Sequence, residues 1–282
     1  MSLSILNNVS SLAAQNQLSV NGASLQKSLL QLSSGSRINS GADDAAGLAI
    51  ADGLMANVTA LTQSARNATD GLGMLQVADG SLAQVTTLLN RAVTLATEAS
   101  NGTVSDTQRT ALDAEFTAIK DEIDRLGTNT TYNGQQVFSG NASDVYLTDG
   151  TSTGSSTISI TVGTLASNSI GFSTGLTAVD LSGDDLTTAG TAQTALTDIS
   201  NAIANVAADR GTLGASMNRL QSASNVISNQ VQNLSAAEDG IRSADMGKTV
   251  SDLSKYSVLQ QTGIAALQQS NQMQQAVLKL LQ

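Results

Sequence analysis

The sequence predicts a mainly α-helical fold: an elongated antiparallel helical bundle or coiled coil with paired terminal helices, one β-hairpin and a small β-rich tip insert. Three observations support this prediction. Apolar residues recur at alternating steps of four and three along residues 54–96 and again along 196–234, which is the spacing of a helical seam. A glycine-containing break separates each of these segments from a terminal helix. Between them, residues 139–190 are rich in Ser, Thr, Gly and Asp.

The composition favours helices that pack through small and aliphatic side chains. The chain has 282 residues, of which 40% are hydrophobic but only 2% aromatic, and it contains no Pro, Cys, His or Trp. Compact cores normally use aromatic side chains heavily, so Ala, Leu, Val and Ile must carry the packing here. Without His or Cys there is no Ser–His triad, Cys nucleophile or His-based zinc site. We therefore expect no enzyme activity, no cofactor and no metal.

Charge and hydropathy argue against two further classes of partner. A net charge of −10 is unsuited to nucleic acid, which is bound through Lys and Arg. No unbroken apolar run approaches the ~20 residues of a membrane span, so we expect no membrane association. The first basic residue is Lys27, so the start of the chain lacks the charged region of a cleavable signal peptide. This predicts either a cytoplasmic protein or export by another route.

The N-terminal segment is predicted to be a helix over residues 1–33. Ser33-Ser34-Gly35 ends this helix, because hydroxyls compete for backbone hydrogen bonds and glycine readily adopts a positive φ. Asp43 and Asp44 then begin the next helix, since carboxylates are favoured at a helix N-terminus. That helix runs from about residue 45 to 100 and would be roughly 80 Å long at ~1.5 Å per residue.

Shorter elements follow the long helix. Ser105-Asp-Thr-Gln108 is a capping box that opens a third helix, which ends near Gly127. Asn133-Gly134 lies between two strand-like pairs and predicts a hairpin with a type I′ turn. Within the insert, residues 157–162 alternate as a strand would.

Helical periodicity then returns over residues 196–234. A second break is predicted within 235–247, around Gly240, and a last helix over about 249–281. This helix carries two apolar stripes, so it must be buried on two sides. The predicted domains are terminal helices at 1–40 plus 245–282, a rod at 41–140 plus 190–244, and an insert at 141–189.

Two charged residues, Asp79 and Arg210, occupy seam positions on the two long helices. Since these helices should run antiparallel, one interpretation is a pair that sets their register. The other is that each side chain reaches solvent at the edge of the seam.

Several motifs resemble bacterial flagellins, and together they cover about residues 1–140 and 190–282. The N-terminal signature is matched by Leu32-Ser-Ser-Gly35, Arg37-Ile-Asn39 and Asp43-Asp-Ala-Ala-Gly47. The family hairpin is matched by Thr131-Tyr-Asn133-Gly134. The C-terminal region is matched by Leu213-Gly-Ala-Ser-Met-Asn218-Arg219-Leu220, Val250-Ser-Asp-Leu-Ser-Lys255, Leu259-Gln-Gln-Thr-Gly263 and Leu278-Lys-Leu-Leu281.

The resemblance implies a secreted structural subunit that polymerises into the extracellular filament of the bacterial flagellum and serves motility. It implies export by the flagellar type III apparatus, with an export chaperone, a distal cap and hook-junction proteins as partners. The terminal helices would form the filament core, with hinges at Gly35 and Gly240. The implied assembly residues are the apolar positions Ile5, Val9, Leu12, Leu18, Leu25, Leu29, Leu32, Leu253, Leu259, Ile264, Leu267, Met273, Val277, Leu278 and Leu281.

A further patch resembles the site at which a vertebrate Toll-like receptor recognises flagellin: Arg91, Leu95 and Glu115 match in type, while Thr94 stands where relatives often carry Glu. The alternative role of these residues is packing between subunits. Two alternative functions for the whole chain are a hook–filament junction protein, which shares the terminal helices, and a coiled-coil surface adhesin, which needs a secretory signal or membrane anchor.

Overall fold

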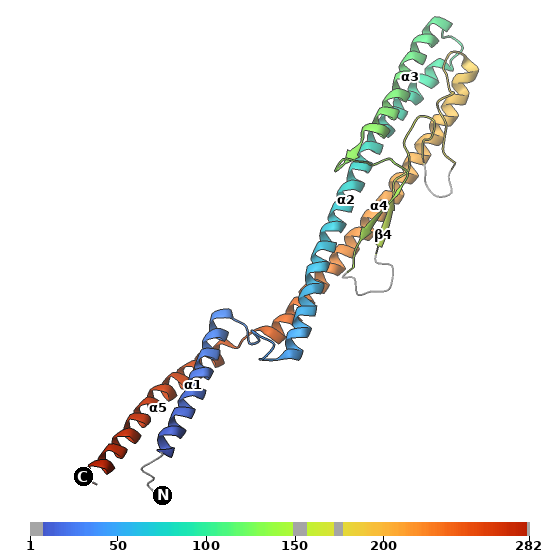
Figure 1. Ribbon diagram of the computed structural model, residues 1–282. Coiled ribbons are helices and arrows are strands. Elements are labelled where there is room, and N and C mark those ends of the chain that lie inside the picture. The colour runs from blue at the N-terminus through green and yellow to red at the C-terminus, as the bar shows by residue number, and fades with distance from the viewer. Residues whose placement is uncertain (1–7, 149–156, 172–176, 281–282) are drawn as a thin grey trace. The chain divides into compact units, whose positions relative to one another are not determined.

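The computed structural model describes residues 8–148, 157–171 and 177–280, and helices dominate this part of the chain (Figure 1). The helices are α1 (Val9–Ser34), α2 (Ala45–Ala99), α3 (Asp106–Asn129), α4 (Ala189–Arg242) and α5 (Met246–Leu280). The strands are β1 (Thr131–Tyr132), β2 (Gln135–Gln136), β3 (Ala142–Tyr146) and β4 (Thr157–Thr161), which form two antiparallel pairs, β1–β2 and β3–β4. The predicted mainly helical class is confirmed.

The chain forms two compact units. We call Met1–Ala56 with Asn233–Gln282 the terminal unit, and Asn57–Gln232 the central unit. The terminal unit is larger than the predicted domain of terminal helices, because it also takes in the start of α2 and the end of α4. The central unit contains both hairpins and the whole of the insert.

In the terminal unit, α1 and α5 pack side by side and run antiparallel (Figure 1). Asn8, just before α1, contacts Ser270 near the far end of α5, whereas residues just after α1 contact residues just before α5. The break after α1 is where the sequence predicts it: Gly35 has φ 71°, and its N–H donates to Gln31 O (3.0 Å).

The two breaks are hydrogen-bonded to each other. Arg37 N–H donates to Arg242 O (2.7 Å), and Ala244 N–H donates to Gly35 O (2.9 Å). The hinge predicted at Gly240 needs correcting, because Gly240 lies inside α4 and the helix ends only at Arg242. A glycine inside a helix costs only about 1 kcal/mol relative to Ala, so Gly240 alone does not determine where α4 ends. The backbone hydrogen bonds with the first break determine it.

In the central unit, α2 packs antiparallel against both α3 and α4. The ion pairs Arg91–Glu115 and Asp79–Arg210 join α2 to α3 and to α4, respectively. The shared core combines Phe116 with aliphatic side chains of all three helices, among them Leu75, Leu82, Leu89, Ile119, Ile123, Ile199, Val206, Leu213 and Leu220. The insert belongs to the same core through Val145, Ile160, Val162, Leu165, Ile170, Leu181 and Leu186.

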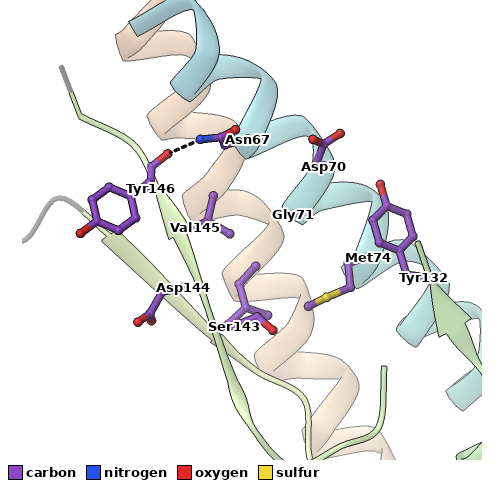
Figure 2. A pocket seen from close by; sticks show the side chains of 10 residues that line it. Asn67, Asp70, Gly71, Met74, Tyr132, Ser143, Asp144, Val145 and Tyr146 are labelled. Carbon is purple, nitrogen blue, oxygen red and sulfur yellow. Dashed lines mark hydrogen bonds between the residues drawn. The ribbon is translucent and has the colours of Figure 1, made fainter. Parts of the chain in front are cut away.

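The strands of the insert lie beside the middle of α2, far along the helix from the α2–α3 turn. Ser64 and Asn67 of α2 donate hydrogen bonds to the backbone at Thr148 and Tyr146. A Cβ on Gly71 would lie only 2.9 Å from Val145 Cγ2, so glycine lets the strand approach the helix closely (Figure 2). The insert reaches this position because α3 folds back along α2 and returns the chain to its middle.

One helix in the described ranges, α2, is long and apolar enough to cross a membrane by length and composition alone. Its mean hydropathy reaches 1.3 over 18 residues. The sequence prediction concerned unbroken apolar runs, and α2 contains none of that length. It passes the test on length and mean hydropathy, which Ala residues raise without forming such a run. A helix that passes this test need not cross a membrane. Elsewhere along its length α2 supplies Leu75, Leu82 and Leu89 to the core, although only 11% of the apolar window itself is buried.

Candidate assembly surface

The contact between α1 and α5 is unusually polar. The side-chain N–H of Asn8 donates to Ser270 O (3.4 Å) and Gln274 Oε1 (3.1 Å), and Ser11 Oγ donates to Asn271 Oδ1 (3.2 Å). The buried side chains of the described terminal helices are also polar: Asn21, Ser28 and Thr249. This helix pair therefore lacks the continuous apolar core that holds the central unit together.

Five of the predicted assembly residues are half-buried in the terminal unit: Leu18, Leu25, Leu32, Leu253 and Leu267. The packing is close at Gly263 of α5, where a Cβ would lie 3.2 Å from the Cδ1 atom of Leu18. These leucines already have partial cover within one chain.

The remaining described assembly candidates face solvent. Val9 and Leu12 each keep 69% of their surface exposed and Met273 keeps 61%, and the group also includes Leu29, Leu259 and Ile264. Four further apolar residues of these helices are exposed as well: Val20, Leu30, Val250 and Val258. The candidates Ile5 and Leu281 lie outside the described residues, as do the side chains of Val277 and Leu278. Exposed apolar faces of this kind mark interaction surfaces.

A charged contact joins the two sides of the first break. Lys27 Nζ lies 2.7 Å from Asp43 Oδ1, while Asp43 Oδ2 accepts hydrogen bonds from Asn39 N–H (3.3 Å) and Ser40 N–H (3.1 Å). The hydrogen bond from Lys27, followed by those from the backbone, lowers the pKa of Asp43 to about 2. Next to it, Asp44 Oδ1 accepts from Gly47 N–H (2.9 Å) and caps the start of α2, as predicted.

The contact between Lys27 and Asp43 is expected to stabilise the break at neutral pH and to be lost in acid. Because the folded pKa of Asp43, about 2, lies below the unfolded value of ~3.9, its contribution is complete above pH ~4 and is lost as pH falls towards ~2. An NMR titration should find the Asp43 carboxyl protonating near the lower value, and Lys27→Met should raise it. A carboxyl that titrates near pH 4 in the unchanged protein would contradict the contact.

The candidate receptor patch is only partly assembled. Arg91 Nε and Nη2 donate to the two carboxylate oxygens of Glu115 (2.7 and 3.0 Å), and both side chains are about half exposed. This bond lowers the pKa of Glu115. Leu95 is 1% exposed and belongs to the core, so it must be removed from the candidate patch. An apolar seam residue cannot face both the core and a receptor.

Asp79 and Arg210 do form a pair. Arg210 Nε donates to Asp79 Oδ1 (2.7 Å) and Nη2 to Oδ2 (3.3 Å), which raises the pKa of Arg210. Each side chain also keeps about a third of its surface exposed. The pair predicted from the sequence is therefore present, and it links α2 to α4 at the edge of the seam, where both side chains also reach solvent. That the pair sets the register stays a prediction.

Sequence reasoning missed Arg109, a buried arginine at the α2–α3 turn. Its guanidinium donates to Ala99 O (2.8 Å), Asn101 O (2.8 Å) and Asp106 Oδ1 (3.1 Å). The predicted capping box at Ser105 and Gln108 is present on the other side of the turn. Arg109 thus satisfies carbonyls at the end of α2 that have no partner within the helix. The only feature of the sequence that could have indicated this role is the position of Arg109 in the first turn of α3.

Comparison with known proteins gives a consistent result. Residues 5–143 match the bacterial flagellin N-terminal helical region, and residues 196–281 match the bacterial flagellin C-terminal helical region. Flagellin of Halalkalibacterium halodurans is 35% identical, with 98% of this chain and 99% of that protein covered. Flagellin of Bacillus subtilis is 32% identical at the same coverage. A putative flagellar hook-associated protein from Vibrio parahaemolyticus shares the fold, with a TM-score of 0.57 at 16% identity, over 71% of this chain and all of that one.

Proposed function

Because this chain belongs to the bacterial flagellin family of filament-forming structural proteins, we propose that it joins the extracellular flagellar filament through the outward apolar faces of α1 and α5. It is a structural subunit that polymerises with copies of itself, not an enzyme. The outward faces comprise Val9, Leu12, Val20, Leu29, Leu30, Val250, Val258, Leu259, Ile264 and Met273.

The observation that supports this assembly route is the division of apolar residues in the terminal unit. Its two helices contact each other through polar and half-buried side chains, which leaves the exposed residues for neighbouring subunits. A contact between different faces of identical subunits continues indefinitely unless it closes into a ring, and so produces a filament. Each side chain stabilises the polymer by roughly 1.5–3 kcal/mol when fully buried, before the entropy of ordering is subtracted.

Ordering of the terminal helices is expected to be coupled to assembly. In a single chain, α1 and α5 have few buried apolar contacts, so their backbone amides should exchange with solvent faster than those of α2 between Leu75 and Leu89. In filaments, exchange in α1 and α5 should slow by at least tenfold while the α2 core changes little. Hydrogen exchange on monomers and filaments measures this, and equal protection of α5 in both states would refute the route.

The export route and the accessory partners are part of the same proposal. Export by the flagellar type III apparatus suits a terminal unit that lacks a continuous apolar core, since such helices unfold at low cost. An export chaperone, a distal cap and hook-junction proteins would then act before and during assembly. The full-length similarity to flagellins at 32–35% identity favours a filament subunit over a junction protein or an adhesin.

A second proposed function is recognition of the monomer by a vertebrate Toll-like receptor. It rests on the exposed Arg91–Glu115 pair, because a half-exposed arginine next to a carboxylate can exchange its partner for one on another protein. Arg91→Ala is expected to lower receptor signalling by monomer at least tenfold, as for an interface residue worth about 1.4 kcal/mol or more.

The matched control is Arg125→Ala. Arg125 forms a comparable exposed pair with Glu122, also on α3. Signalling in a receptor reporter assay should be insensitive to this change. Unchanged protein that gives no signal, or an equal loss in both variants, would remove Arg91 and Glu115 from consideration as a recognition patch.

A further inference from the structure

The two outer edges of the β3–β4 sheet are treated differently in the central unit. The edge of β3 is covered by α2: Asn67 Nδ2 donates to Tyr146 O (3.2 Å), as Figure 2 shows, and Ser64 Oγ donates to Thr148 O (2.9 Å). Covering an edge in this way prevents another strand from pairing with it.

The register of the sheet determines which backbone groups lie on the opposite edge. Since the carbonyl of Tyr146 points towards α2, the alternation of an antiparallel ladder directs residues 143 and 145 towards β4. Their partners in register are Ile160 and Ile158. The N–H and C=O groups of Ser159 and Thr161 therefore point away from β3.

These outward groups of β4 have no hydrogen-bond partner among the described residues. Within the ranges that the structure describes, neither the backbone nor a side chain forms a hydrogen bond with the N–H or C=O of Ser159 or Thr161. Beyond the strand, Val162 O does turn towards β3, where it accepts from Gly140 N–H (3.2 Å), as the same alternation requires. The edge of β4 is thus a template for strand pairing.

A groove of about 300 Å³ runs along this edge, and its other wall is α4. Val206 and Leu213 of α4 contribute to its apolar floor, while the hydroxyls of Thr212 and Ser216 lie at its rim. This volume is at the lower end of the ~300–1,000 Å³ typical of ligand sites. The groove therefore suits a short segment rather than a whole sheet.

We propose that this groove binds a short, extended, basic segment of another protein, which adds to the sheet as a third strand against β4. Strand addition takes its affinity from backbone hydrogen bonds and its selectivity from alternate side chains. The single charged residue among those lining the groove is acidic, Asp209, and Asp144 accepts a hydrogen bond from Ser159 on the same strand pair.

The charge of the central unit identifies the kind of partner. This unit carries sixteen acidic and seven basic side chains, whereas the terminal unit carries seven and six. Two copies of so acidic a surface repel each other, and a basic strand is attracted. All the residues that line the groove belong to the central unit, whereas the faces that we propose for assembly belong to the terminal unit.

The test uses full-length monomer and a labelled synthetic peptide of eight residues that alternates Val and Lys. Fluorescence anisotropy should detect binding, and a peptide that alternates Val and Glu should bind at least tenfold more weakly. Methylation of alternate backbone nitrogens removes the hydrogen-bond donors of one edge and keeps the side chains. Two such peptides are compared, one methylated at the odd-numbered and one at the even-numbered residues. At least one of them should bind tenfold more weakly, or worse, than the unmethylated peptide.

Three variants locate the site. Thr161→Pro removes an outward N–H without removing a bond to β3, and Thr161→Val keeps that N–H as a matched control. Thr212→Trp fills the groove from α4, so the test stands even if the proline disturbs the strand. Proline and tryptophan should each weaken binding at least tenfold, and valine should not.

Several results would overturn the proposal: no binding of the basic peptide, equal binding of all methylated peptides, or binding unchanged by both proline and tryptophan. Dimerisation of the chain in analytical ultracentrifugation that Thr161→Pro abolishes would also overturn it, since a second copy would then be the occupant. Binding with slowed hydrogen exchange at the Ser159 and Thr161 amides would support it.

Discussion

Ile264→Asp is expected to leave the chain folded and monomeric under conditions in which the unchanged protein forms filaments. Ile264 lies on α5 with 45% of its surface exposed, so a carboxylate there remains hydrated in the monomer. In the proposed polymer the same position is covered by a neighbouring subunit. The variant then loses roughly 1.5–3 kcal/mol of apolar burial and must also bury an unpaired charge. The critical concentration for polymerisation should rise at least ~100-fold, which corresponds to about 2.7 kcal/mol.

Ile264→Leu is the matched control for this change. It alters the same exposed position of α5 but keeps an apolar side chain of similar volume that a neighbouring subunit can bury. Circular dichroism should show equal helix content in both variants, and electron microscopy should show filaments only for the control. If Ile264→Asp polymerises as readily as Ile264→Leu, the outward face of α5 does not form the subunit contact.

Local features of the structure were predictable from short stretches of sequence. The hairpin turn has φ of 50° at Asn133 and 76° at Gly134, as a type I′ turn requires. Ser105 and Gln108 cap each other at the start of α3, and Gly35 takes the positive φ that ends α1. Each of these features is determined by residues within a few positions of one another, so a short sequence pattern is enough to predict it.

Features that depend on distant residues were not predictable in this way. The second break lies after Gly240 because it pairs with residues 35–37, some 200 positions earlier. The two stripes of α5 gave no indication that Leu267 is half-buried while Ile264 is exposed, since both fit an apolar helix face. Leu95 was placed in a receptor patch by residue type alone, although its seam position carries it into the core.

Two helical glycines show the same division between local and distant causes. Replacing glycine by alanine is expected to stabilise the central unit at one of them and to destabilise it at the other. Gly80 lies in α2, where an added Cβ would meet nothing within 4 Å. Gly80→Ala should stabilise the central unit by about 0.5–1 kcal/mol, because alanine loses less conformational freedom on folding. Gly127 lies in α3, and an added Cβ would be 1.8 Å from Leu165 O, a backbone atom that cannot turn aside.

Gly127→Ala is therefore expected to destabilise the central unit, although helix propensity alone predicts the reverse. The segment around Leu165 cannot move away cheaply, because Ser167 N–H and Oγ both donate to Asp124 of α3 (2.6 and 2.9 Å) and Leu165 itself is part of the core. Overpacking of this kind costs about 1–3 kcal/mol and sometimes more. The midpoint temperature of thermal unfolding should fall by roughly 4–10 °C for Gly127→Ala and rise by ~1–4 °C for Gly80→Ala. A Gly127→Ala protein as stable as the Gly80→Ala protein would show that the insert is not held against α3 in solution.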